Sequence, residues 1–298
     1  MAKNCKTAKA KAAAQPPRTV SGLTTDEDRA LYGSENLTVE NCRFEGPADG
    51  ESALKESRNC TVSGSFFALR YPFWHNDGLT VLNSRLTETC RAPFWYDRGV
   101  RVAKTRIHGV KAFRECSDVV LTGCDIVSAE FGWNCRNVTI GGNSRIESEY
   151  FLFGARNVHM RDTTMTGKYS FQYVKGGEIR DCVLNTKDAF WHSEDLTVTD
   201  CVINGEYLGW YAKNLRLVRC KITGTQPLCY CENLVLEECT MEGCDLAFEY
   251  CTLDAAILGD IVSIKNPIHG SISADSIGEI ILDEHRKPES DCVIRTKK

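Results

Sequence analysis

The chain has 298 residues, with 36 Lys and Arg residues, 40 Asp and Glu residues and a formal net charge of −4 at pH 7. The basic residues are spread along the chain and form no stripe that would hold a phosphate backbone, so nucleic acid is a poor candidate for a ligand. No apolar run approaches the roughly 18–20 residues that cross a bilayer, so we expect no membrane span.

The first 17 residues, MAKNCKTAKAKAAAQPP, are rich in Lys and Ala and lack the apolar stretch of a secretory signal peptide. We interpret residues 1–17 as a disordered basic tail, and an organelle-targeting leader is the alternative. Sixteen cysteines without an export signal are typical of reduced thiols rather than of a disulfide framework. The expected location is therefore cytoplasmic.

From residue 36 onward, a turn-type residue followed by an apolar-x-apolar pattern recurs at a nearly constant spacing. Successive units are 23, 19, 21, 19, 19, 20 and then repeatedly 19 residues apart. So regular a period leaves no room for a domain boundary, and we expect one domain over residues 18–298. The units begin at Asn36, Asn59, Gly78, Gly99, Asp118, Asn137, Asn157, Gly176, Asp195, Asn214, Asn233 and Thr252.

Each unit carries short alternating segments, as in NLVLEECTM (Asn233–Met241), and alternation indicates strands. Asn, Gly and Asp recur at the first position because they tolerate the left-handed backbone of a sharp corner. A unit of 19 residues cannot bury its own apolar side chains, so neighbouring units must stack. The sequence predicts an all-β, right-handed parallel β-helix of about a dozen coils over residues 36–258, with an N-terminal cap and a C-terminal cap at 259–298.

A leucine-rich repeat is the alternative, because its units have a similar length. It would show an L-x-x-L-x-L pattern with a recurrent Asn, whereas here β-branched residues and Cys occupy the second strand. Six residues after the turn lie Cys42, Cys124, Cys182, Cys201, Cys220 and Cys239. Ligands stacked along one line do not converge on a single ion, so we predict neither a metal site nor a cofactor.

Three adjacent columns of equivalent positions separate core from surface. The first is entirely nonpolar and should face the core: Phe73, Phe94, Phe113, Gly132, Leu152, Phe171, Phe190, Gly209, Leu228 and Ala247. The second, the Trp column, contains every Trp of the chain: Trp74, Trp95, Arg114, Trp133, Phe153, Gln172, Trp191, Trp210, Cys229 and Phe248. The third, the corner column, is polar and aromatic: His75, Tyr96, Glu115, Asn134, Gly154, Tyr173, His192, Tyr211, Tyr230 and Glu249.

Neighbouring positions of a strand point to opposite sides, so an inward Phe column places the Trp column outward. An internal stack that fills volume remains the alternative. An outward stripe could stack sugar rings, and its polar groups could bind hydroxyls. The candidate ligand-binding residues are Trp74, Trp95, Trp133, Trp191, Trp210, His75, Tyr96, Arg114, Glu115, Tyr173, His192 and Tyr211, although structural hydrogen bonds are the commoner role for the two histidines.

Glycan cleavage would use carboxylates beside the stripe, and the best placed are Glu130, Glu149 and Asp188. Glu130 and Glu149 belong to adjacent coils and are the nearest pair. Lys168 or Lys187 would be the base in a β-elimination.

Segments such as GPADGESALKES, LRYPFWH, TKDAFWH and GEYLGWY resemble the bacterial family known as domain of unknown function 3737. The resemblance implies a single-stranded right-handed β-helix of the pectin-lyase-like superfamily and no established activity. Because that superfamily includes polysaccharide lyases and glycoside hydrolases, a glycan ligand is expected by analogy. Three functions stay open: a carbohydrate-binding surface, a glycan-cleaving enzyme, and a scaffold or protein-interaction module. The expected partner is a saccharide or another ring-bearing ligand, and the sequence leaves the oligomeric state open.

Overall fold

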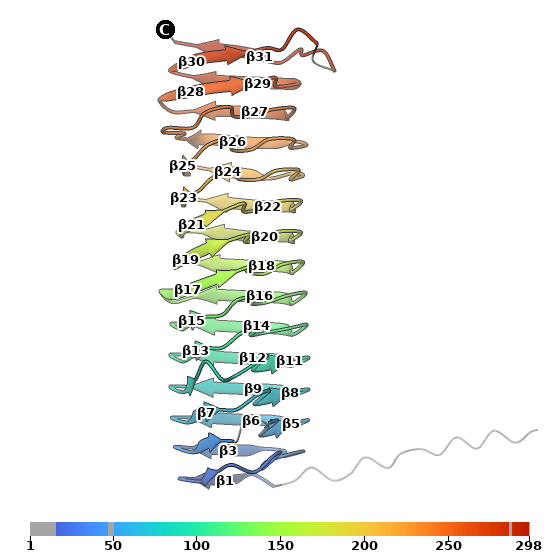
Figure 1. Cartoon of the computed structure of the whole chain (residues 1–298), viewed down its shortest axis with the longest axis vertical. Helices are drawn as coiled ribbons and strands as arrows, with labels where there is room; N and C mark the ends of the chain where they lie inside the picture. Colours follow the sequence, from blue (N-terminus) through green and yellow to red (C-terminus); the bar gives the residue numbers. More distant parts are fainter. Residues whose placement is uncertain (1–15, 47–50, 286–287, 298) are drawn as a thin grey trace, which may run out of the picture.

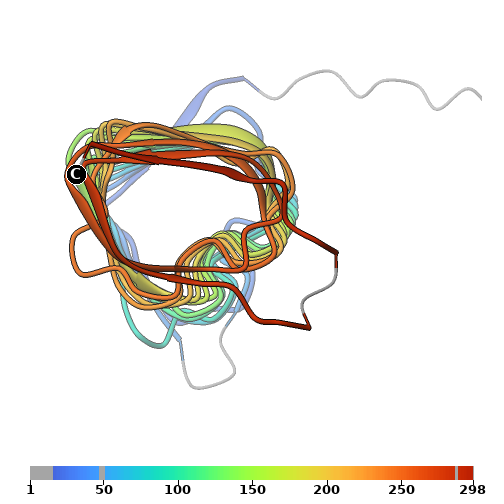
Figure 2. The same ribbon diagram turned by 90° about the horizontal axis from the view of Figure 1, so that it is seen from above.

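The computed structural model describes residues 16–46, 51–285 and 288–297, and most of the tail expected at 1–17 therefore lies outside it. Its strands are all parallel, and they stack into a rod whose coils follow one another along the axis (Figure 1). Seen along that axis the coils superpose, as equal repeat lengths require (Figure 2). No helix occurs in the described ranges. The predicted all-β parallel solenoid is confirmed, and it is consistent with a right-handed β-helix.

The largest sheet contains one strand from each coil and runs the whole length of the rod. It has 15 strands: β1 (Arg18–Ser21), β3 (Leu37–Glu40), β6 (Arg58–Ser63), β9 (Asp77–Leu82), β12 (Arg98–Ala103), β14 (Ser117–Thr122), β16 (Arg136–Gly141), β18 (Arg156–Arg161), β20 (Lys175–Arg180), β22 (Glu194–Thr199), β24 (Arg216–Val218), β26 (Leu234–Cys239), β27 (Thr252–Ile257), β29 (His269–Ala274) and β31 (Val293–Thr296).

The second wall of the rod is an 11-stranded sheet made from the second strand of each unit. Its strands are β2 (Thr24–Thr25), β4 (Arg43–Glu45), β7 (Phe66–Ala68), β10 (Arg85–Leu86), β13 (Arg106–His108), β15 (Asp125–Val127), β17 (Ser144–Glu149), β19 (Thr163–Lys168), β21 (Val183–Lys187), β23 (Val202–Asn204) and β25 (Lys221–Thr223). Two smaller sheets complete the described strands: β5 (Leu54–Lys55), β8 (Phe73–Trp74) and β11 (Phe94–Trp95) in one, β28 (Asp260–Lys265) and β30 (Ser276–Ile281) in the other.

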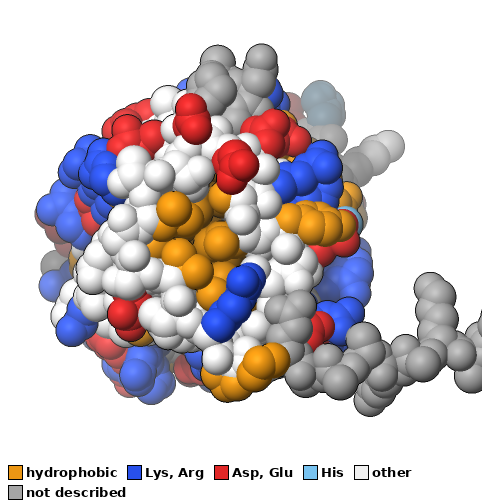
Figure 3. Space-filling model, turned by 90° about the horizontal axis from the view of Figure 1, so that it is seen from below, with side chains coloured by type: hydrophobic (Ala, Val, Ile, Leu, Met, Phe, Trp, Pro, Cys, Tyr) orange, Lys and Arg blue, Asp and Glu red, His pale blue; other side chains and the backbone are white. Residues whose placement is uncertain are grey.

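The coils extend beyond the twelve units visible in the sequence. β1 pairs in register with β3, so residues 18–35, expected to form a cap, already form a coil. At the other end, β29 and β31 continue the 15-stranded sheet within the predicted cap of 259–298. At the N-terminal end, apolar side chains are visible in the middle of the end face (Figure 3). Val20, Leu23 and Ala30 are partly buried there against the core.

The core is a set of side-chain columns that run along the axis. Alternation in the strands points Val100 and Val102 inward, and Ile107 faces them from the other sheet; all three are fully buried. Phenylalanines fill the middle, as shown by Phe94 and Phe113, whose rings stack with centroids 4.2 Å apart. The prediction of an inward Phe column is therefore correct.

The cysteine column stabilises the corner between the two main sheets. The backbone N–H of Cys182 donates to Cys201 Sγ at 3.4 Å, and in other coils a hydroxyl accepts the same bond, as from Ser65 N–H to Ser84 Oγ at 3.1 Å. Small weak acceptors thus satisfy a buried N–H in successive coils. The residues within the described ranges contain no group of three or more His, Cys, Asp or Glu side chains arranged to hold a metal ion.

Candidate functional site: a gap in an aromatic column

The five tryptophans lie half-buried on the outer wall of the rod, outside the phenylalanine core. Trp74 and Trp95 stack with their centroids 5.3 Å apart and their planes 10° apart. Trp191 and Trp210 stack at 5.3 Å and 6°. Each ring of a pair therefore covers one side of the other ring. The stack is external, but it is not an open platform.

Other side chains cover further sides of these rings. Lys55 Nζ lies 3.9 Å from the centroid of Trp74, and the Arg114 guanidinium lies 4.9 Å from that of Trp133. The indole N–H groups of Trp133 and Trp210 donate to backbone carbonyls of the following coil, at 2.8 and 2.9 Å. The Trp column, predicted as the main ligand surface, is mostly occupied by contacts within the protein.

The corner column is more exposed, because its backbone turns outward. Tyr96, Tyr173 and Tyr211 are 43%, 45% and 46% exposed. All three have positive φ, between 56° and 60°, in the left-handed region that bulky residues seldom adopt. A hydrogen bond to the next coil accompanies the turn, as from Tyr96 N–H to Arg114 O at 3.0 Å. The strained corner thus repeats from coil to coil and projects each side chain from the rod.

The last coil corrects one detail of the predicted columns. Phe248, predicted in the Trp column, is fully buried, and Tyr250 instead of Glu249 continues the corner column by stacking on Tyr230 at 6.0 Å. The corner is one residue shorter here, because two residues separate Tyr250 from Thr252 where three separate Tyr230 from the matching Asn233.

Over most of its length the corner column is a continuous stack of rings. Tyr173 stacks on His192 at 4.8 Å, His192 on Tyr211 at 5.0 Å, and Tyr211 on Tyr230 at 4.9 Å. In these contacts the planes differ by at most 12°. A ring inside such a stack presents its edge to solvent, because its neighbours cover both of its sides.

The stack is interrupted in the middle of the rod. The three coils after Tyr96 carry Glu115, Asn134 and Gly154 in this column, and the rings resume at Tyr173. With strands about 4.8 Å apart, the distance from Tyr96 to Tyr173 is roughly 19 Å. Gly154 keeps the gap open, since a Cβ on it would lie 2.7 Å from Asn134 Oδ1.

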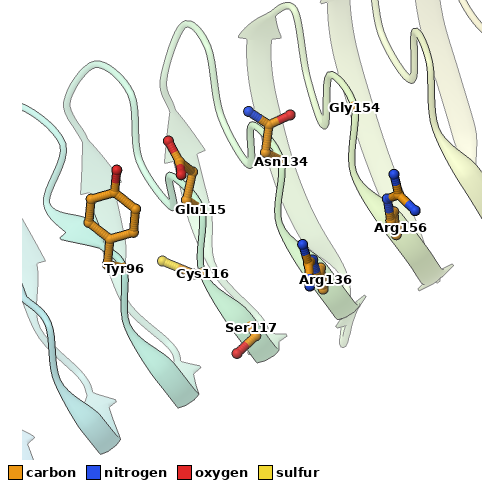
Figure 4. A pocket seen from close by; sticks show the side chains of 8 residues that line it. All are labelled: Tyr96, Glu115, Cys116, Ser117, Asn134, Arg136, Gly154 and Arg156. Carbon is orange, nitrogen blue, oxygen red and sulfur yellow. The ribbon is translucent and has the colours of Figure 1, made fainter.

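This gap is a pocket of about 420 Å³ (Figure 4). Tyr96 stands at its N-terminal end and is seen with its ring face-on. The ring contacts His75 at 5.2 Å and Trp95 at 5.4 Å, and no aromatic ring covers it from the following coil. The pocket is lined by Tyr96, Glu115, Cys116, Ser117, Asn134, Arg136, Gly154 and Arg156.

Of the twelve predicted ligand-binding residues, the structure places only Tyr96 and Glu115 in this pocket. Ser117, Arg136 and Arg156 were missed because they belong to a different column, at the start of the 15-stranded sheet, which reaches the pocket across the corner. A signal for them exists in the sequence: the dipeptide Arg-Asn occurs at 136–137 and again at 156–157, one repeat later.

The three predicted catalytic acids lie outside this pocket. Glu130 Oε2 is 3.1 Å from Lys111 Nζ and 3.5 Å from Arg114, and Glu149 Oε1 is 3.1 Å from Lys168 Nζ. Ion pairs therefore engage both carboxylates. Lys187, the other proposed base, is paired with Glu206 at 2.9 Å.

Asp188 is buried at a corner of the rod. Burial raises the pKa of its carboxyl group, while the positive charges of Lys187 and Lys168 oppose the rise. A second pocket, of about 550 Å³ on the 11-stranded sheet, is lined by Glu149, Lys168 and Lys187 among others, but not by Glu130 or Asp188. The structure therefore does not bring the three acids together in one pocket.

The described part of the chain has no helix long and apolar enough to cross a membrane. A comparison with curated protein sequences gives no match.

Solved structures with a similar chain path have very low sequence identity. A surface adhesin of Streptococcus pneumoniae, PfbA, is 7% identical, with a TM-score of 0.38 over 89% of this chain and 81% of that one. A mutant tailspike protein of E. coli bacteriophage HK620, in complex with a pentasaccharide, is 10% identical, with a TM-score of 0.39 over 92% and 65%. The A-module of a mannuronan C-5 epimerase of Azotobacter vinelandii is 7% identical, with a TM-score of 0.36 over 94% and 89%.

A family model matches nearly the whole of the repeat region. It covers residues 18–295, from the first strand of the 15-stranded sheet to its last. The chain therefore belongs to the DUF3737 family of proteins of unknown function.

Proposed function

We propose that this protein binds a saccharide in the gap of the corner column. The observation that carries the proposal is the open ring of Tyr96 at one end of a pocket whose walls otherwise bear hydrogen-bonding groups. Sugar rings have apolar C–H surfaces that pack on aromatic rings, and hydroxyls that need donors and acceptors. Tyr96 supplies the first, and Glu115, Asn134 and Ser117 supply the second.

The pocket supports binding better than paired-carboxylate hydrolysis. That reaction uses two carboxyl groups on either side of the scissile bond. Among its lining residues only Glu115 carries one. Glu130 and Glu149, proposed as such a pair, are each engaged by a basic side chain elsewhere on the rod.

A glycan array probed with the full chain tests the proposal, followed by calorimetric titration of the strongest hit. Tyr96→Ala should weaken binding of that glycan by roughly 1–3 kcal/mol, because it removes the stacking surface. Tyr211→Ala is the matched control: it removes a tyrosine of similar exposure whose ring is covered on both sides. Absence of any bound glycan, or equal losses in the two variants, would contradict the proposal.

A further inference from the structure

The column at the start of the 15-stranded sheet alternates in charge along much of the rod. It contributes one residue per coil, just before each turn residue. In three places a basic residue of this column pairs with an acid of a neighbouring coil, at nitrogen–oxygen distances of 2.8–2.9 Å: Arg98 with Asp77, Lys175 with Glu194, and Lys213 with Glu232. Opposite charges on neighbouring strands stabilise a sheet.

Arg136 and Arg156 break this pattern. They lie directly opposite each other in the parallel register of β16 and β18. Ser117 precedes them, and Lys175, which follows, is already paired with its own acid. Within the described residues no acid lies within ion-pair distance of either arginine. Like charges at directly opposed positions repel, so this contact is unfavourable until an anion joins it.

The two arginines line the same pocket as Tyr96. Figure 4 shows them on neighbouring strands along one side, while Tyr96, Glu115 and Asn134 come from the corner. Their backbones are separated by the strand spacing of about 4.8 Å. Two guanidinium groups at that separation can donate to the oxygens of one anion, and planar forked donors favour carboxylate, sulfate and phosphate.

We infer that the saccharide bound in the gap is anionic, and that Arg136 and Arg156 together hold its carboxylate or sulfate group. The inference rests on the proposed function and adds the chemical class of the ligand. Tyr96 packs against a sugar ring, and the anionic substituent points toward the arginines. Glu115 lies on the corner side, where it accepts hydrogen bonds from hydroxyl groups.

The test uses a glycan array that contains neutral, uronate-containing and sulfated glycans, probed with the full chain at low and at high salt. The strongest hit is then titrated beside its uncharged counterpart, obtained by carboxyl reduction or desulfation. Inorganic sulfate serves as a competitor. The variants are Arg136→Gln and Arg156→Gln, with Arg156→Lys to keep the charge while removing the fork. Arg101→Gln is the control, an exposed arginine of β12 outside the pocket.

We expect hits confined to anionic glycans, with affinity that falls as salt rises. Arg136→Gln and Arg156→Gln should each weaken the anionic glycan about tenfold and leave binding of its uncharged counterpart within about twofold, since each removes a charge-assisted hydrogen bond. Arg156→Lys should lose less, and Arg101→Gln almost nothing.

Other outcomes separate this inference from the proposed function. Equal binding of neutral and anionic glycans, with no effect of the arginine variants, would overturn the inference and leave saccharide binding intact. Competition by inorganic sulfate at the same concentration as the glycan would assign the arginines to a free anion and overturn the saccharide assignment. If no glycan binds at all, both proposals are wrong.

Discussion

Trp191 and Trp210 stack with their ring centroids 5.3 Å apart and their planes 6° apart, so each ring shields one side of the other from water. The indole N–H of Trp191 also donates to the backbone carbonyl of Tyr207 on the next coil. The pair therefore connects two coils through both its rings and a hydrogen bond.

Replacing Trp191 by Ala should lower stability while leaving the pocket unchanged. We expect a loss of about 1–3 kcal/mol, because the site is only half-buried and the change removes a stacked pair and a hydrogen bond. Thermal melts measure the loss. Binding of any glycan found on the array should stay the same, since Trp191 does not line the pocket. A stability close to that of the parent, with weakened glycan binding, would return the Trp column to the role of a ligand surface.

Asp97 predicts a pH dependence of stability. Its side chain is 1% exposed, and burial raises its pKa well above the ordinary value of 3.8, although hydrogen bonds from Asn76 and Trp95 oppose the rise. The folded protein thus holds a proton that the unfolded chain releases. The stabilising contribution is complete below about pH 3.8 and is lost as the pH rises toward the folded pKa.

Asp97→Asn should therefore raise the melting temperature at pH 8 by more than it does at pH 4. The amide oxygen can still accept the bond from Asn76 N–H, which is 2.6 Å long in the parent. Asp77→Asn is the control, because its carboxylate is exposed and paired with Arg98. The prediction fails if the difference between Asp97→Asn and the parent is the same at both pH values.

The thiols should be almost inert in the folded protein. Fourteen of the fifteen described cysteines are buried, and Cys292 is half-buried. Burial raises the pKa of Cys292 to about 11 and that of Cys229 to about 12, so both are protonated at neutral pH. The thiolate is the reactive form.

Alkylation followed by peptide mass spectrometry checks this expectation. Among the described cysteines, only Cys292 should be labelled without denaturant, and faster as the pH approaches 11. The others should react after unfolding. Rapid native labelling of Cys182 or Cys220 would show that the cysteine column opens.

Glu149→Gln should change stability by less than about 1 kcal/mol, because its partner Lys168 is substantially exposed and surface ion pairs contribute little. Glycan binding in the corner gap should be unaffected, since Glu149 lies outside that pocket. Melting temperature and calorimetric titration measure the two effects. If a glycan-cleaving activity is found and Glu149→Gln abolishes it, the acids near the 11-stranded sheet regain a catalytic role.

Much of the fold could be predicted from the repeat, because each coil contacts only its neighbours and equivalent positions meet at the strand spacing. The inward Phe column and the structural cysteine column follow from that rule. The coils formed by residues 18–35 and by β29 and β31 were missed, since they lack the 19-residue pattern with its turn residue. The short corner before Thr252 displaced Phe248 and Tyr250 by one position, because a count from the turn cannot locate a deletion inside a coil.

The sequence by itself therefore determined the parallel solenoid and the side chains that share a column, since both depend only on a period and on alternation. Tertiary structure decided how the rings are oriented and which columns meet. It turned the Trp rings onto one another, engaged Glu130 and Glu149 in ion pairs, and brought Arg136 and Arg156 across the left-handed corner to Tyr96. These contacts depend on rotamers and on the angle between two walls of the rod, and neither is encoded in the spacing of the repeat.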